Sequence, residues 1–333
     1  MTNTCEEHFG EEQEMLDLDE ALAWDPMRLV PPDPWVGHIP FAFWLIKALR
    51  PRNLVELGTH SGNSYFAFCQ AVARFCPGAR SFAVDTWQGD AHAGHYGDEI
   101  FTDVDCFNRA HFAQFSTLLR TTFDDARGYF PDGETDLLHI DGLHSYEAVK
   151  HDFDNWKGAV SPRGVVLFHD TNVRERDFGV WRLWKELSET YPSFEFGHSH
   201  GLGVLGFGAD QAPLLRRLFE IGGEAEAAAT LRHGVARRGE SLQRQVTLLT
   251  QRGELDGLRR QVTVAHAEIE SAKAHIDELT KAFSSERTAE RAEADQRFDH
   301  ARQTYLDEIH GRDALIAERS LVIDTKDELI RTF

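Results

Sequence analysis

Between residues 53 and 207 the sequence alternates short apolar runs with segments of helical periodicity. The clearest apolar runs lie at 53–57, 81–85, 136–141 and 164–170. Alternation of this kind is typical of parallel strands joined by crossover helices. The first and last of these runs are almost continuously apolar, as strands covered on both faces should be. We therefore predict an α/β fold with a doubly wound, mostly parallel sheet.

The other predicted elements complete this sheet and cover it. A weak strand is expected at 118–122, and a closing hairpin at 194–196 and 202–207. The expected helices are 41–49, 63–75, a short segment near 124, 145–156 and 178–189. Residues 86–110 form a long polar segment for which no element is predicted.

The C-terminal third differs in composition and in period. All 11 Pro, all seven Trp and all four Cys lie before residue 214. Further on, apolar residues recur every seventh position, with a second series three positions later: Leu255, Val262, Ile269, Ile276 and Phe283, then Leu258, Ala265, Ala272 and Leu279. This 3.5-residue period is typical of a coiled coil. It slips near Glu286 and resumes in apolar pairs at 315–316, 322–323 and 329–330, which predicts one stutter.

These patterns divide the chain into three predicted parts. They are an acidic N-terminal arm at 1–34, an α/β domain at 35–230 and a long α-helical coiled coil at 240–333. A solvated helix without a partner is the alternative for the last part, although an isolated helix gains little stability without packing. We expect the coil to make the chain a homo-oligomer.

Charge and hydropathy exclude several classes of protein. The formal net charge is −20, and residues 231–333 contain 17 basic and 19 acidic side chains, so nearly all of the charge lies before them. An acidic domain repels phosphate backbones, which argues against a nucleic-acid partner. The sequence has no run of 18 apolar residues, so no membrane span is predicted, and its first residues lack a signal-peptide pattern. A cytoplasmic protein is expected.

The first chemical signal is a glycine turn after the predicted strand at 53–57. Its pattern is E-x-G-x-x-x-G, with Glu56, Gly58 and Gly62. Gly58 allows the tight turn, and Gly62 would let a ligand approach the N–H groups that open the next helix. Asp85 ends the following strand, where a carboxylate can accept ribose hydroxyls. An acid placed for an ammonium group and an acid placed for a ribose together describe S-adenosylmethionine; an ordinary strand-to-helix turn is the alternative.

The second signal lies at the ends of two later strands. Asp141 and His144 follow the strand at 136–141, and His169 and Asp170 end the strand at 164–170. Neighbouring parallel strands bring such ends about 5 Å apart. Carboxylates there suit Mg²⁺, and ligation by His169 would favour Mn²⁺ or another borderline metal. A turn-forming role for Asp141 and a hydrogen-bonded structural role for His169 remain open.

His144 follows the first of these carboxylates by three residues. Its imidazole titrates near neutral pH and could take a proton from a substrate hydroxyl. The alternatives are a ligand or substrate contact and a purely structural role. We interpret His144 as the general base.

At these residues the stretch from Trp35 to Gly208 resembles the class I S-adenosylmethionine-dependent methyltransferases. Within them it is similar to the metal-dependent subgroup that includes sugar O-methyltransferases and cephalosporin-hydroxylase-like proteins. The resemblance implies a seven-stranded Rossmann-like sheet and cofactor contacts by Glu56, Gly58, Thr59, Ser61, Gly62, Ser64 and Asp85. It also implies a metal site at Asp141, His169 and Asp170 with His144 as catalytic base. His169 stands where the family can have an acid.

The expected activity is therefore methyl transfer from S-adenosylmethionine to a hydroxyl of a sugar or glycan, with help from Mg²⁺ or Mn²⁺. The resemblance extends to methyltransferase modules of polysaccharide biosynthesis that occur beside glycosyltransferases, so a glycosyltransferase is an expected partner. The alternative is a coiled-coil scaffold or chain-length-regulating protein whose domain binds the cofactor without turnover. A hydroxylase-like relative on the same fold is a further rival, because fold alone does not decide function.

Overall fold

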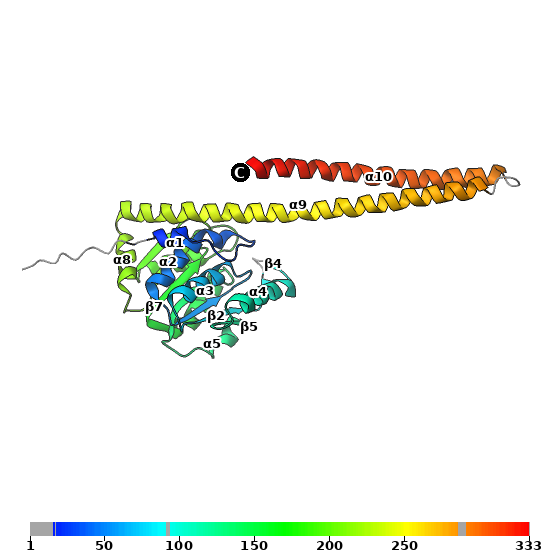
Figure 1. The fold of residues 1–333 in the computed structure, drawn as a ribbon. Helices are drawn as coiled ribbons and strands as arrows, with labels where there is room; N and C mark the ends of the chain where they lie inside the picture. Colours follow the sequence, from blue (N-terminus) through cyan, green and yellow to red (C-terminus); the bar gives the residue numbers. More distant parts are fainter. Residues whose placement is uncertain (1–15, 17, 91–93, 286–290, 333) are drawn as a thin grey trace, which may run out of the picture. The chain divides into compact units, whose positions relative to one another are not determined.

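The computed structural model describes residues 16, 18–90, 94–285 and 291–332 (Figure 1). The chain forms two compact units, Met1–Val246 and Thr247–Phe333. About half of the predicted acidic arm at 1–34, residues 1–15 and 17, lies outside the described residues. No helix in the described part of the chain is long and apolar enough to cross a membrane.

A seven-stranded sheet forms the centre of the first unit. Its strands in spatial order are β5 (Ser116–Arg120), β2 (Arg80–Asp85), β1 (Asn53–Leu57), β6 (Thr135–Ile140), β7 (Val160–His169), β9 (Leu202–Gly206) and β8 (Ser193–Phe196). The first five strands are parallel, and β9 pairs antiparallel with both β7 and β8. The predicted doubly wound, mostly parallel sheet of seven strands is confirmed. A separate two-stranded ribbon pairs β3 (Gly89–Asp90) with β4 (Gly94–His95).

Helices cover both faces of this sheet because its apolar side chains alternate between two cores. Leu54, Leu137 and Val165 belong to one core, with residues of α2 (Ile39–Leu49), α3 (Asn63–Phe75) and α8 (Pro213–Ile221). Val55, Leu138 and Val166 belong to the other core, with residues of α5 (Phe123–Arg127), α6 (Tyr146–Trp156) and α7 (Val180–Ser188). Successive strand residues point to opposite faces, so a continuously apolar strand feeds both cores.

Some elements differ from the prediction. The polar segment at 86–110 contains α4 (Asp98–His111), in which Val104 and Asn108 are buried, while Ile100, Phe101 and Phe107 pack partly buried against the core. The spacing of these apolar residues is helical, so the sequence held a signal for this helix. The helix α8 and the first half of β7 were also not expected. The remaining short helices are α1 (Asp19–Ala23) and the 3-10 turns Pro34–His38 and Lys157–Ala159.

The long helix α9 (Ala225–Ser285) begins inside the first unit. Its buried residues there are Ala228, Leu231, Val235, Leu242 and Val246, all in the core shared with α2 and α3. The compact unit therefore extends to Val246, beyond the expected end of the domain at residue 230. These residues follow a helical period. The period alone does not say whether they pack on the α/β domain or on another helix of a coiled coil.

The second unit is an antiparallel pair of helices, formed by the rest of α9 and by α10 (Arg291–Thr332). Ion pairs cross between the two helices at Glu254–Lys326 and Glu268–Arg312, and Ile269, Ile309 and Ile316 form their buried core. The apolar seam is thus paired with the same chain. The interpretation of the slip near Glu286 as a stutter in one helix is wrong, since two separate helices flank it and run in opposite directions.

Candidate active site

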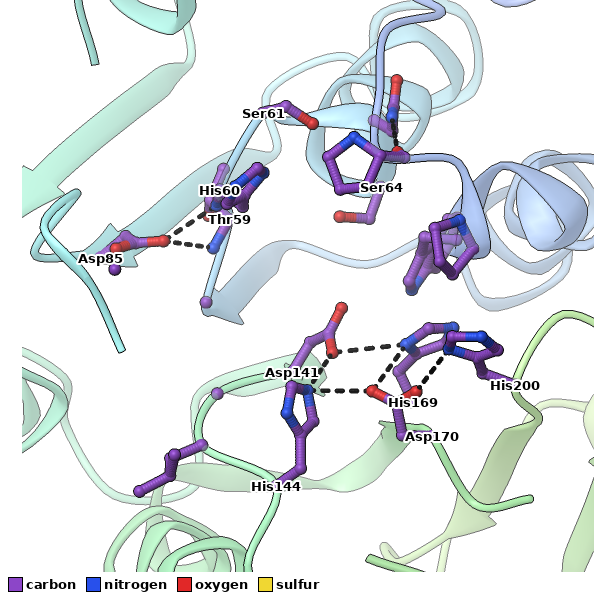
Figure 2. A pocket seen from close by; sticks show the side chains of 18 of the residues that line it. Thr59, His60, Ser61, Ser64, Asp85, Asp141, His144, His169, Asp170 and His200 are labelled. Atoms are coloured by element: carbon purple, nitrogen blue, oxygen red, sulfur yellow. Dashed lines mark hydrogen bonds and ion pairs between the residues drawn. The ribbon is translucent and has the colours of Figure 1, made fainter. Parts of the chain in front are cut away.

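A pocket of about 550 Å³ lies at the carboxyl ends of the central parallel strands. Its walls come from the turn after β1, the residues after β2 and β6, and the end of β7, as Figure 2 shows. Crevices at this end of open α/β sheets are where ligands bind. Of the residues predicted for the site, those that line the pocket are Gly58, Thr59, Ser61, Ser64, Asp85, Asp141, His144, His169 and Asp170.

Gly58 is required by its surroundings as well as by its backbone angle. Its φ is +88°, and a Cβ there would lie 2.0 Å from the carbonyl oxygen of Asp141. The N–H of Gly58 donates to the carbonyl of Val84 at 2.9 Å. The glycine therefore lets the turn after β1 approach the loop after β6, and both halves of the pocket depend on it.

Asp85 lines the pocket but already accepts three hydrogen bonds. Its Oδ2 accepts from the backbone N–H groups of Thr59 (2.8 Å) and His60 (2.9 Å), and its Oδ1 accepts from the N–H of Trp87 (2.7 Å). A carboxylate offers about four acceptor positions, so roughly one remains for a ligand. In this arrangement Asp85 mainly holds the turn that follows Gly58 (Figure 2).

Glu56 is fully buried and does not belong to the residues that line the pocket. Trp35 Nε1 donates to His139 Nε2 at 3.1 Å, and an indole can only donate, so the proton of neutral His139 lies on Nδ1. That Nδ1–H donates to Glu56 Oε2 at 2.8 Å. Burial raises the pKa of Glu56, and the hydrogen bond from His139 opposes this rise. In the structure the partner of Glu56 is thus the buried His139, whereas the sequence predicts a contact with the ammonium group of S-adenosylmethionine.

Gly62 also differs from its predicted role. It has a φ of +82° at the N-terminus of α3, and a Cβ there would meet the ring of Phe66 at 2.6 Å. It is not among the residues that line the pocket. The need for glycine therefore comes from helix geometry and close packing, and neighbouring Thr59, Ser61 and Ser64 face the pocket instead.

Two carboxylates and two imidazoles meet at the other side of the pocket (Figure 2). His144 Nε2 lies 2.9 Å from Asp170 Oδ2 and 3.5 Å from Asp141 Oδ1. His169 Nδ1 lies 3.2 Å and 3.4 Å from the same two oxygens. The strand ends thus bring together all four residues predicted for this side of the site.

Burial and charge act in opposite directions on these groups. Burial would raise the pKa of both carboxyl groups, but the imidazoles of His169 and His144 hold the pKa values of Asp141 and Asp170 well below the usual range. Burial would lower the pKa of His144, but hydrogen bonds that its imidazole donates to Asp141 and Asp170 raise it to about 9. At neutral pH this arrangement corresponds to imidazolium groups between carboxylates, so His144 holds a proton that a general base must first lose.

The same donors fit a divalent cation. One ligand atom each from Asp141, His144 and Asp170 lie within 4.8 Å of one another. The carboxylate oxygens and imidazole nitrogens lie 2.9 to 3.5 Å from one another. Adjacent ligands of an octahedral ion with bonds near 2.1 Å are separated by a similar distance, roughly 3 Å. An imidazole ligand beside two carboxylates favours Mn²⁺ or another borderline metal over Mg²⁺, which prefers oxygen ligands.

Sequence reasoning missed two residues of this cluster. His200, between β8 and β9, lines the pocket, and its Nδ1 lies 3.1 Å from Asp170 Oδ1. Phe178 lines the pocket and stacks on His144, with ring centroids 4.7 Å apart and planes 4° apart. His169 ends a predicted strand, and His198 and His200 lie in the turn of the predicted hairpin beside it, which was the available signal for His200.

A family model and one relative match parts of this chain. Residues 55–171 match a family model described as a methyltransferase domain. The uncharacterized protein y4gI of Sinorhizobium fredii is 49% identical over 226 residues, which are 63% of this chain and 25% of that protein. This chain thus spans about a quarter of the length of that relative.

Similar solved structures have lower sequence identity. A putative caffeoyl-CoA O-methyltransferase from Staphylococcus aureus is 14% identical, with 50% of this chain and 80% of that chain covered and a TM-score of 0.40. The O-methyltransferase TomG from Streptomyces achromogenes, in complex with SAM, is 14% identical, with 57% and 91% covered and a TM-score of 0.37. Residues 55–171 thus match a methyltransferase domain, and the unit that contains them has a Rossmann-like sheet by its strand order.

Proposed function

We propose that this domain transfers a methyl group from S-adenosylmethionine to a hydroxyl group of a sugar or glycan. The observation that carries the proposal is the single pocket that joins the Gly58 turn of a methyltransferase domain to the cluster of Asp141, His144 and Asp170. One side would hold the cofactor, and the groups on the other side would bind and deprotonate a hydroxyl. Methyl transfer needs both within one cavity, because the hydroxyl oxygen must reach the methyl carbon in line.

The methyl donor would lie along the turn after β1. Thr59, Ser61 and Ser64 face the pocket there, and Asp85 fixes the backbone of the turn through Thr59 and His60. S-adenosylmethionine supplies an electrophilic methyl group on a sulfonium. The chain's own contribution is position: a rigid turn, held by a buried carboxylate, keeps the donor at a constant place relative to the strand ends.

The acceptor hydroxyl would lie beside the carboxylate cluster, with Mg²⁺ or Mn²⁺ held by Asp141, Asp170 and the imidazoles. A bound divalent cation lowers the pKa of a hydroxyl that it coordinates. His144 is placed either to ligate this cation or to take the hydroxyl proton, and Phe178 fixes the plane of its ring. The positive charge of a cation between the carboxylates would favour the unprotonated form of His144. A general base must be in that form to accept a proton.

An assay of methyl transfer tests this function. The protein would be incubated with S-adenosylmethionine labelled in the methyl group, a panel of sugars and glycans, and Mg²⁺, Mn²⁺ or EDTA. We expect label in an acceptor, loss of transfer after chelation and recovery on adding metal. Transfer that survives thorough chelation would reject the cation. Cofactor binding by calorimetry with no transfer to any acceptor would favour the scaffold or chain-length-regulating protein.

We also propose that the second unit mediates self-association. Leu315, Val322 and Leu329 recur every seven residues on α10 and are 44%, 41% and 51% exposed, beside the Ile309 and Ile316 that pack within the unit. A regular exposed apolar stripe suits a second copy of the same hairpin. Sedimentation equilibrium should show a dimer or higher species that Val322→Lys weakens. Val264→Lys, at an exposed valine of α9 outside this stripe, is the matched control, and equal mass for wild type and Val322→Lys would overturn the proposal.

A further inference from the structure

The loop between β8 and β9 has a strained backbone next to the carboxylate cluster. Ser199, His200 and Gly201 have φ values of +48°, +70° and +94°. Residues other than glycine rarely adopt this region, so surrounding contacts must hold Ser199 and His200 there. A Cβ on Gly201 would also lie 2.6 Å from Thr171 Oγ1, so the loop packs tightly on the residues after Asp170.

This loop fixes two imidazoles of the site. The carbonyl of Ser199 accepts from His169 Nε2 at 3.2 Å, and a carbonyl can only accept, so Nε2 carries the proton. His169 Nδ1 is thereby the nitrogen that faces Asp141 and Asp170. A metal-binding histidine usually donates its other N–H to a group of this kind. His200, the next residue, places its Nδ1 3.1 Å from Asp170 Oδ1.

The beginning of α9 holds this loop from behind. Ser199 Oγ donates to Gln243 Oε1 at 3.3 Å, and Gln243 Nε2 donates to the carbonyl of Asp33 at 3.1 Å. Asp33 precedes Pro34 and Trp35, which line the pocket. One amide side chain, on a helix that does not itself line the pocket, therefore joins two segments of the pocket wall.

Close backbone contact supports the same arrangement. A Cβ on Gly239 would lie 2.1 Å from the carbonyl oxygen of Gly37, so α9 approaches the turn at 34–38 directly. A Cβ on Gly37 would in turn lie 1.9 Å from Ser199 Oγ, and His198 Nε2 donates to the carbonyl of Gly37 at 3.0 Å. Helix, turn and loop are thus in close contact. The turn and the loop are also joined by the bond from His198 to Gly37 and by His38 Nε2, which donates to the carbonyl of Ser199 at 3.0 Å, and Gln243 adds the link from α9.

We propose that Gln243 is a positioning residue for the cation side of the pocket: by holding Ser199, it sets the ring orientation of His169 and the approach of His200 to Asp170. The inference rests on the proposed function for the identity of the site. It assigns a role in that site to a helix that the sequence predicts to be coiled coil.

The test uses Gln243→Met, which keeps the length of the side chain and removes both hydrogen bonds. Gln245→Met is the matched control, because Gln245 is an exposed glutamine on the same helix. Mn²⁺ affinity would be measured by electron paramagnetic resonance and S-adenosylhomocysteine affinity by calorimetry. Amide hydrogen exchange would be followed at Asn172 and Gly201, whose N–H groups donate to the carbonyls of His200 and His198.

We expect Gln243→Met to weaken Mn²⁺ binding by about tenfold, the lower range for loss of an outer-shell partner. Exchange at the two amides should rise, and affinity for S-adenosylhomocysteine should change less than about twofold. Gln245→Met should resemble wild type. Ser199→Ala, which removes the other end of the bond, should give the same effects, with no further change in the double variant.

Wild-type Mn²⁺ affinity and unchanged exchange in Gln243→Met would overturn the positioning role. Additive effects of the two substitutions would also overturn it, because the two groups would then act separately. If the wild-type protein binds neither Mn²⁺ nor S-adenosylhomocysteine, the proposed function fails. The exchange measurement still decides in that case whether Gln243 holds the loop.

Discussion

His144 contacts both carboxylates of the cluster and stacks on Phe178, so its substitution separates two roles. A general base contributes roughly 10²–10⁴-fold to turnover. We expect His144→Ala to lower kcat by that factor. If the imidazole is only a base, Mn²⁺ affinity should stay close to that of wild type; if it is a ligand, affinity should fall with kcat. Full turnover in His144→Ala would contradict both roles.

Asp152 is a buried carboxyl group on α6 that takes no part in this cluster. Burial raises its pKa from an ordinary value of 3.8 to about 7. Between these two values the folded state binds the proton and the unfolded state does not, so this group's contribution to stability falls as the pH rises from about 4 to about 7. Above pH 7 the ionised, buried carboxylate remains a cost.

Asp152→Asn should therefore gain stability relative to wild type as the pH rises from 4 to 8, by at most about 4 kcal/mol. Chemical denaturation at several pH values measures this difference. Asp154→Asn is the control with the opposite sign, because hydrogen bonds from Lys150 and Lys157 lower the pKa of Asp154. Parallel stability profiles for wild type and Asp152→Asn would show that the burial of Asp152 has no effect.

At the scale of elements, the contact between the turn after β1 and the loop after β6 joins the two halves of the pocket. Gly58 and Gly78 have nearly the same φ, +88° and +91°, but only Gly58 has backbone atoms where a Cβ would lie. Gly78→Ala should cost about 1–2 kcal/mol, the penalty of the left-handed backbone. Gly58→Ala should cost more than about 3 kcal/mol and abolish binding of S-adenosylhomocysteine.

Thermal unfolding and calorimetry on the two glycine variants measure these effects. The pair separates backbone strain from steric contact, since strain is shared and contact is not. Equal losses of stability in the two variants would mean that the turn after β1 can move away from Asp141 without cost.

Elements with strong apolar patterns could be predicted from the sequence, while those whose form depends on a distant partner could not. The strand at 53–57 and the helix at 63–75 are observed with those bounds, and four of five and nine of 13 of their residues are buried. The helix α4 is mostly exposed, and its apolar residues at 100, 101, 104 and 107, although helically spaced, lie among charged residues in a segment that is polar overall. In the site, strand ends brought Asp141, His144, His169 and Asp170 together as predicted, but the partner of Glu56 is His139, 83 residues away.

At the scale of the whole molecule, the chain has separate cores in its two units. Ile316 lies in the small core of the helical pair and is 8% exposed, whereas Val264 is 58% exposed. Ile316→Asn should therefore destabilise the helical pair by about 3 kcal/mol. Val264→Asn should change its stability by less than about 0.5 kcal/mol.

Thermal unfolding followed by circular dichroism at 222 nm should resolve this difference. In Ile316→Asn an early transition should appear for the helical pair, while the transition of the α/β unit and the affinity for S-adenosylhomocysteine stay constant. A uniform shift of all transitions would show that the two units unfold as one.

The central claim is that one pocket holds the methyl donor and a cation between neighbouring strand ends. Diffraction from crystals grown with S-adenosylhomocysteine and Mn²⁺, with data collected at the manganese absorption edge, tests it most directly. We predict an anomalous peak within bonding distance of Asp141 and Asp170, and the adenosyl ligand along Thr59, Ser61 and Ser64 in the same cavity. An adenosyl ligand bound elsewhere, or manganese density away from both carboxylates, would contradict the account.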